Sequence, residues 1–251
     1  MRVSATLGGV IVVIGCPSYR PPEGANPDGV GGSAASVAFA AAAAGARVQL
    51  VGRIGDDAVG DALVLALGRS GVGHAALLRD PGHPTPILVA PAAEIAEDDT
   101  VADLPPGAAL AGTILEEELA SATAATAGDV VLPENQKERP RLAPADLELA
   151  LRYLPDIAVI VAADPLDEPS ARVVADGAAY AGAQVIATVP PGTRVPDALV
   201  AATVLEAPPS DPDGAFARLV GGFAAALDGG ASPAEAFRAA ASRVGWESAS
   251  T

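Results

Sequence analysis

The sequence predicts an α/β protein with a doubly wound, mostly parallel sheet and helices on both faces. Short runs of Val, Ile and Ala have the length and composition of buried strands, at residues 10–14, 48–51, 157–162 and 184–188. Helical stretches alternate with them, at residues 34–44, 144–154 and 168–181. Strands that alternate with helices are typical of a parallel sheet. With 251 residues, half of them hydrophobic, the chain can bury a full core, and we expect one domain over residues 1–251.

The charge balance narrows the possible partners. Fifteen basic residues stand against 31 acidic ones, and the formal net charge of −16 argues against nucleic acid and anionic membrane surfaces. Cys16 is the only cysteine, so neither an internal disulfide nor a cysteine metal cluster can form. We expect a cytoplasmic protein that binds a small molecule and no metal, since His74 and His83 have no partner at ligand spacing.

The first apolar run has two interpretations. Residues 13–16 have the form of a lipoprotein processing site. The apolar run before it, residues 7–14, is short for a signal core and only Arg2 is basic, so we favour a first buried strand that ends at Gly15.

Residues 31–60 organise the rest of the chain. Gly31 and Gly32 open a helix and leave backbone N–H groups available to a polar ligand, with Ser33 as the predicted N-cap. The helix over residues 34–44 is almost all alanine and can lie close against a sheet; the alternative is that it forms a dimer interface. Gly45 ends it, a strand follows, and a glycine turn with two aspartates leads into a helix over residues 62–67.

Residues 31–72, from GGSAASVAFAAAAAGARV to ALGRSGV, resemble the amino-terminal signature of the ribokinase-like (PfkB) carbohydrate kinases, GGxxxNxAxxxAxLGxxVxxxGxxGxDxxGxxxxxxLxxxGV. The match runs without a gap. It implies the ribokinase fold and an ATP-dependent kinase ancestry. Residues 16–30, where the family has a β-lid over the sugar, are short and rich in proline, so we expect a lid that is reduced or absent.

The remaining elements are less regular. After residue 72 we expect short strands separated by Pro/Gly turns, then a helix over residues 114–127 and a strand over 129–132. A weak strand at 202–205 precedes two closing helices, at 219–227 and 233–244, and Ser232 caps the second.

The carboxy-terminal signature of the family reads DTxGAGDAFxGGF. Its GAG backbone is an anion hole and its last Asp is the catalytic base, as phosphoryl transfer requires. Here the sequence is DPDGAFARLVGGF, which aligns Asp211 with the first Asp, Gly214 and Ala215 with GA, Phe216 with the second Gly, and Ala217 with the base. The catalytic carboxylate is therefore missing. A shifted alignment offers Asp213 as base, although Asp213 also reads as a helix N-cap.

Other positions of the family pattern differ as well. Arg20 stands at the sugar-binding Asp and Ser36 at the Asn of the GGxxxN motif, whereas Thr85 falls where the family has a threonine beside the substrate. No NxxE motif exists downstream, and residues 205–211 leave no room for the segment that builds the nucleotide pocket.

The resemblance and these differences support three hypotheses. The first is a pseudokinase that binds a small polar or anionic metabolite, with Arg20, Gly31, Gly32, Ser36 and Thr85 as candidate contacts and a remnant of the anion hole at Gly214 and Ala215. The second is an active sugar or nucleoside kinase that uses ATP and Mg, with Asp213 or Asp211 as base. The third is a structural protein that forms a homodimer.

Overall fold

The computed structural model describes residues 8–20, 29–88, 139–209, 211 and 213–245. Six parallel strands form its central sheet, in the order β5-β4-β1-β6-β7-β8. Their bounds are β1 Val10–Ile14, β4 Arg47–Gly55, β5 Val72–Asp80, β6 Ile157–Ala162, β7 Gln184–Val189 and β8 Thr203–Glu206. The predicted doubly wound sheet is confirmed.

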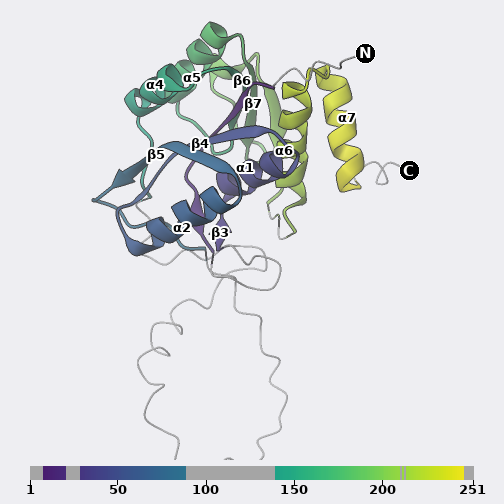
Figure 1. Cartoon of the computed structure of the whole chain (residues 1–251). Helices are drawn as coiled ribbons and strands as arrows, with labels where there is room; N and C mark the ends of the chain where they lie inside the picture. Colours follow the sequence, from purple (N-terminus) through teal and green to yellow (C-terminus); the bar gives the residue numbers. More distant parts are fainter. Residues whose placement is uncertain (1–7, 21–28, 89–138, 210, 212, 246–251) are drawn as a thin grey trace, which may run out of the picture.

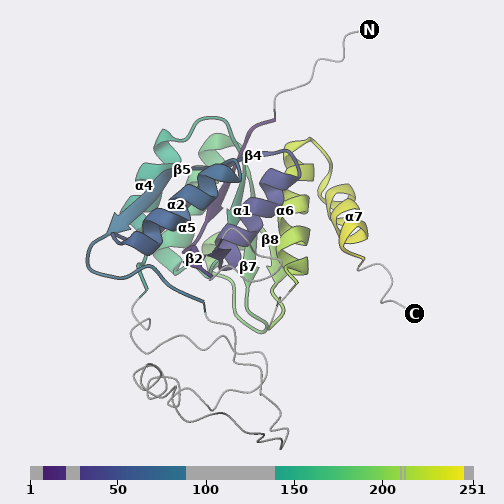
Figure 2. The ribbon, with the colours of Figure 1, turned by 60° about the horizontal axis from the view of Figure 1, so that its bottom comes forward.

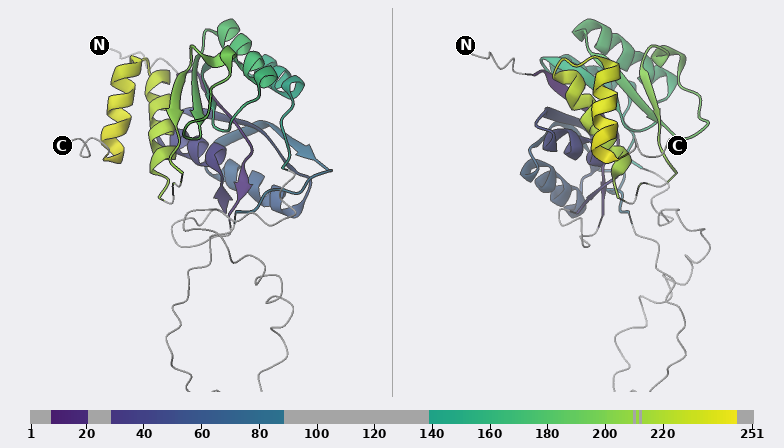
Figure 3. Two further views of the ribbon diagram at one scale, coloured as in Figure 1. Left: turned by 180° about the vertical axis from the view of Figure 1, so that it is seen from behind. Right: turned by 90° about the vertical axis from the view of Figure 1, so that its right-hand side faces the viewer.

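Helices cover both faces of the sheet (Figures 1 and 2). One face carries α1 (Ser33–Ala43), α2 (Ala58–Arg69) and α6 (Ala215–Asp228). The other carries α4 (Pro144–Tyr153), α5 (Glu168–Ala181) and the short 3₁₀ helix η3 (Asp197–Leu199). The last helix, α7 (Pro233–Val244), packs on the outside of α6 (Figure 3).

The alternation of side chains along the strands divides the core in two. Ile11 and Val13 of β1 point toward α1 and α6, while Val10, Val12 and Ile14 point toward α4 and α5. All five residues are buried, as expected for the central strand of a parallel sheet with two covered faces.

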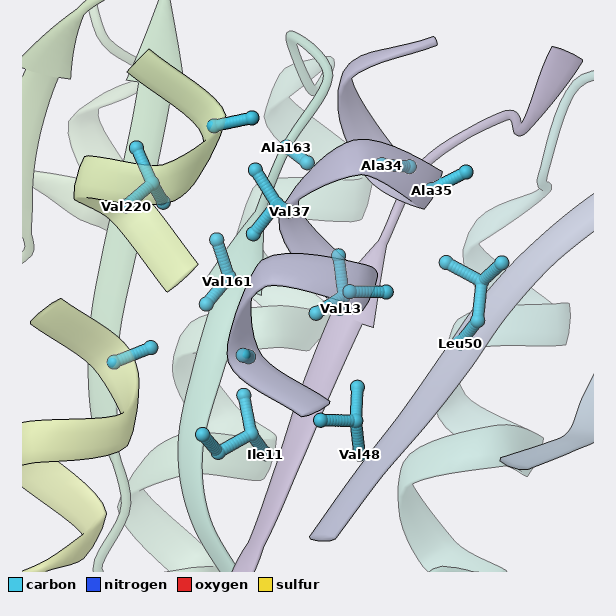
Figure 4. Close-up of a cluster of buried hydrophobic side chains, with 14 of the residues drawn as sticks. Ile11, Val13, Ala34, Ala35, Val37, Val48, Leu50, Val161, Ala163 and Val220 are labelled. Atoms are coloured by element: carbon cyan, nitrogen blue, oxygen red, sulfur yellow. The ribbon is translucent and has the colours of Figure 1, made fainter. Parts of the chain in front are cut away.

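The alanine-rich helix α1 belongs to the core. Its Ala34, Ala35, Val37, Ala38 and Ala41 are at most 1% exposed, and Figure 4 shows the helix lying over β1, β4 and β6. A Cβ built on Gly221 of α6 would stand 2.6 Å from the Cβ of Ala40, so glycine permits the close crossing of α1 and α6. The interpretation of this helix as a dimer interface is therefore wrong.

Several boundaries differ from the sequence prediction. Helix α2 begins at Ala58 and α6 at Ala215, each four residues earlier than expected, and β5 is one nine-residue strand. Gly32 is the N-cap of α1, with φ +84° and no side-chain cap, so Ser33 is the first helical residue instead of the cap. The elements predicted at 114–127 and 129–132 lie outside the described residues.

A small second sheet lies in the region where the sequence predicts a reduced or absent lid. It pairs β2 (Ser18–Tyr19) with β3 (Val30–Gly31) in antiparallel fashion. Tyr19 also exchanges backbone hydrogen bonds with the segment at residues 86–88, donating to the carbonyl of Pro86 and accepting from the amide of Leu88, both at 2.7 Å. Each strand has two residues, and residues 21–28 between them lie outside the described part of the chain, so a reduced lid stays a prediction.

Candidate functional site

The strand order places a topological switch point between β1 and β6. From β1 the chain builds the sheet outward through β4 to β5, then returns to the opposite side of β1 with β6. In open α/β sheets, the crevice at the carboxyl ends of such strands is the usual ligand site. The residues that follow β1 and β6 are therefore the first place to look for chemistry.

Asp164 lies at this switch point. Its Oδ2 accepts a hydrogen bond of 2.6 Å from the amide of Cys16, which has left the β-ladder. A Cβ on Gly15 would stand 2.8 Å from this oxygen and 2.7 Å from the Cβ of Ala34, so the missing side chain of Gly15 leaves room for the carboxylate beside the start of α1. Burial raises the pKa of Asp164, and the Cys16 amide and the nearby Arg139 only partly offset this effect.

The diglycine lies beside the same crevice. Gly31 ends β3, and Gly32 precedes α1; a Cβ on Gly32 would stand 3.2 Å from the Oγ of Ser18 and 3.4 Å from the carbonyl oxygen of Cys16. Ser36 is half-buried in the first turn of α1, and its amide donates to the carbonyl of Gly32. Gly32 thus allows close packing of the segment 16–18 against the helix start, and Gly31 allows the close approach of Leu88 and Arg20.

Arg20 directly follows β2 and is half-buried. Its amide donates to the carbonyl of Gly29, and its Cβ would stand 3.1 Å from a Cβ on Gly31. Within the described part of the chain, no ion pair or side-chain hydrogen bond of Arg20 is present. The backbone and Cβ of Arg20 therefore lie beside Gly31, and its guanidinium has no partner among the described residues.

Thr85 is buried and belongs to a hydrogen-bonded cluster with Asp57, Gly55 and Gly60, called the Asp57 latch below. Asp57, the N-cap of α2, accepts from the amide of Gly60 and from both the amide and the hydroxyl of Thr85, each at 2.7 Å. The same hydroxyl accepts from the amide of Gly55 at 3.0 Å. Burial would raise the pKa of Asp57, but these hydrogen bonds outweigh it and hold the pKa below its ordinary value. The latch ties the segment around residue 85 to the end of β4, and contact of Thr85 with a substrate stays a prediction.

The N-terminus of α6 is capped by Asp211. The Oδ1 of Asp211 accepts from the amide of Phe216 at 3.0 Å, and its Oδ2 accepts from the amide of Ala217 at 3.1 Å. A carboxylate of this chain therefore takes the position at which an anion would meet the helix dipole and the free amides. The sequence pattern aligned Asp211 with the family motif without predicting this contact.

The neighbouring motif positions are structural. The side chains of Phe216 and Ala217 are each 6% exposed and belong to the core between the sheet and α6. Gly214 is the N-cap, with φ +66°, and Ala215 begins the helix. Asp213 is exposed and makes no side-chain hydrogen bond with a described residue. The interpretation of Asp213 as the capping side chain is therefore wrong, because the carboxylate of Asp211 accepts the hydrogen bonds from the helix amides.

Two further polar features lie away from the switch point. Arg53 pairs with Asp146 at 2.9 Å and with Asp80 at 3.5 Å, and Asp80 also contacts His83 at 3.0 Å. These pairs join β4, β5 and the start of α4. Beside them, a shallow apolar groove of about 260 Å³ runs between β5 and α4, with Asp146 at its edge.

The described residues hold no group of three or more His, Cys, Asp and Glu side chains that could bind a metal ion. Among these same residues, no helix has the length and apolar character needed to cross a membrane.

The model of the pfkB family carbohydrate kinases matches residues 24–139. The resemblance to the PfkB family is confirmed. No curated protein matches the chain. The PfkB match covers the diglycine, α1 and the Asp57 latch, whereas Asp164 and the start of α6 follow it in the sequence.

Solved structures share the fold. The crystal structure of a protein named Sa239 aligns over 97% of each chain, with a TM-score of 0.60 and 12% identity. An E. coli protein assigned as ribokinase II, in complex with ATP and Mg²⁺, aligns over 93% of this chain and 90% of its own, with a TM-score of 0.55 and 13% identity. At such low identity these likenesses establish the ribokinase-like fold alone.

Proposed function

We propose that this PfkB-family protein is a pseudokinase that binds a small polar or anionic metabolite at the carboxyl edge of its sheet. The observation that carries the proposal is the start of α6. Phosphoryl transfer needs free donors that stabilise charge on the moving phosphoryl group, and a carboxylate in reach of the attacking hydroxyl. At α6 the amides of Phe216 and Ala217 are bound to Asp211 instead.

The residues at the start of α6 are not suited to bind the phosphates of a nucleoside triphosphate. A phosphate that approached these amides would have to displace Asp211, whose negative charge opposes it. The position aligned with the catalytic base is the apolar, buried Ala217. In addition, only residues 207–214 connect β8 to α6, so the chain has no separate segment there that could cover an adenine ring.

The proposal that the metabolite is anionic rests on Arg20. The backbone and Cβ of Arg20 lie next to Gly31, and guanidinium groups bind phosphate and carboxylate in bidentate fashion. Titration with D-ribose 5-phosphate tests this, with Arg20→Ala as the variant and Arg152→Ala on α4 as the control for lost positive charge. Equal affinity in wild type and Arg20→Ala would remove Arg20 from the site.

Calorimetric titration with Mg·ATP, and separately with ADP, tests the loss of kinase function. The protein is first shown to be folded by its thermal transition. We expect no heat of binding with either nucleotide and no phosphate transfer to D-ribose or D-fructose. Micromolar binding of Mg·ATP would contradict the proposal.

The alternative is an active ATP-dependent sugar or nucleoside kinase. The exposed carboxylate of Asp213, one residue before the N-cap of α6, is the observation that keeps it open. In that case phosphate transfer should be lost in Asp213→Asn. Transfer that survives both Asp213→Asn and Asp211→Asn would exclude each as the base.

A further inference from the structure

One side of the molecule exposes apolar side chains beside the shallow groove between β5 and α4. Strand β5 is the edge strand of the described sheet, and both elements lie on the side opposite to α7 (Figures 1 and 2). We call this surface, with its groove of about 260 Å³, the α4–β5 face. Its apolar residues include Ala75, Ala76, Leu78, Leu149, Ala150 and Tyr153.

Two large side chains of this face project into solvent. Leu149 is 53% exposed and Tyr153 is 77% exposed, and both line the groove. Because they are four residues apart in α4, they lie on the same side of the helix, one turn from each other. A single exposed apolar side chain is ordinary on a protein surface. Two that adjoin an apolar groove are typical of a surface that contacts another protein.

Charged residues flank this apolar pair with the same spacing. Glu148 and Arg152, each one residue before a member of the pair, are both exposed. Within the described part of the chain, neither takes part in an ion pair or a side-chain hydrogen bond. If two copies of α4 pack antiparallel about a two-fold axis, Glu148 of each copy lies opposite Arg152 of the partner subunit. The same axis places Leu149 opposite Tyr153 of the partner subunit, so one arrangement satisfies both pairs.

The local charge permits contact with a second copy. The formal net charge of −16 opposes association of two copies over most of the surface. On α4, however, Asp146 is paired with Arg53 at 2.9 Å, and Arg152 balances Glu148. The charges of this helix and its ion-pair partner therefore sum to zero, and their order along α4 is complementary to itself when the helix is reversed. An interface between identical copies requires such self-complementarity.

We propose that the α4–β5 face is the interface of a homodimer, in which two copies of the chain pack antiparallel along α4 about a two-fold axis. The apolar pair and the groove form the centre of this interface, and the charged pair forms its rim. The face lies away from the switch-point crevice, so the inference is independent of the proposed binding function.

Sedimentation velocity of the full-length protein over a range of concentrations tests the interface. We expect the wild type to form a dimer, and Tyr153→Ala to weaken dimerisation about tenfold or more, as for an aromatic residue at the centre of an interface. Tyr180→Ala removes the exposed tyrosine of the neighbouring helix α5 and is the matched control, with no change expected. The thermal transition of each variant checks that it is folded.

Charge reversal tests the two-fold axis itself. Glu148→Arg and Arg152→Glu each place like charges opposite one another twice in the dimer, so each variant should dimerise about tenfold more weakly than wild type. An equimolar mixture of the two variants brings opposite charges together again and should form the mixed dimer, which native mass spectrometry detects. The double variant, which exchanges the two charges, should dimerise as the wild type does.

Each contrary outcome removes a defined part of the inference. A wild-type protein that stays monomeric, as it would if a different protein covered this face, overturns the homodimer. A dimer that Tyr153→Ala weakens no more than Tyr180→Ala does overturns the α4–β5 face as its interface. A dimer lost in both charge reversals and not restored in their mixture overturns the antiparallel arrangement.

Discussion

Replacing Asp211 with alanine removes both hydrogen bonds that cap α6. The loss of an N-cap costs about 0.5–2 kcal/mol, and the loss of a negative charge at a helix start costs about 0.3–1 kcal/mol. We therefore expect Asp211→Ala to lower the free energy of unfolding by about 1–2 kcal/mol. For a chain of this size, that corresponds to a fall in Tm of about 3–6 °C.

Urea and thermal denaturation measure this effect, and the neighbouring acid provides the control. Asp213 is exposed, and its side chain bonds no described residue, so Asp213→Ala should change stability by no more than about 0.5 kcal/mol. If Asp211→Ala is as stable as wild type, or if the two variants lose equal stability, Asp211 does not cap α6. The proposal that a carboxylate of the chain occupies the anion-binding amides of α6 would then fail.

Three further predictions follow from other contacts. Gly221→Ala should cost about 1–3 kcal/mol in urea denaturation because its Cβ would press against Ala40, whereas Gly222→Ala, whose Cβ has no neighbour nearer than 3.7 Å, should be neutral or stabilising. The lowered pKa of Asp57 means that its latch stabilises the fold above about pH 3.8 and is lost as the pH falls below that value, so Asp57→Asn should flatten the acid side of the stability profile. The raised pKa of Asp164 has the opposite effect, because the folded state holds this proton more tightly than the unfolded state. Wild-type stability should therefore fall as the pH rises from about 3.8 through the folded pKa. Asp164→Asn should be more stable than wild type near neutrality, and an equal or lower Tm would contradict this.

Local signals explain which elements the sequence could predict. The bounds predicted for the strand Ile157–Ala162 and the helix Glu168–Ala181 agree with the structure. Asp167 caps this helix by accepting from the amide of Ser170, Pro occupies its first turn, and Gly182 ends it in the left-handed conformation, so each boundary is set by nearby residues.

Other features depend on contacts between distant residues. Strand β4 extends to Gly55 because it pairs with β5 from Val48 as far as Gly55, opposite Asp80. The sequence does not show which strands are neighbours. Asp164 was missed for the same reason. An acid after a buried strand is a visible signal, but its importance depends on β6 lying next to β1.

The start of α6 shows a limit of motif alignment. The pattern aligned Asp211 with the first Asp of the family motif and Ala217 with the catalytic base, and this assignment stays a prediction. It assigned the residues before 219 to a phosphate loop, whereas they form the first turn of the helix, closed by Asp211. The amides at this helix start therefore have a hydrogen-bond partner within the chain.

The only cysteine of the chain offers a chemical reporter for the crevice. Burial, with the help of Asp164, raises the pKa of the Cys16 thiol to about 12. Because only the thiolate reacts, on the order of one molecule in 10⁵ is reactive at neutral pH. The rate at which a thiol reagent labels native protein should therefore be low at neutral pH and rise with pH as the thiolate fraction grows. A molecule that settles against Asp164 would slow the labelling, whatever its identity.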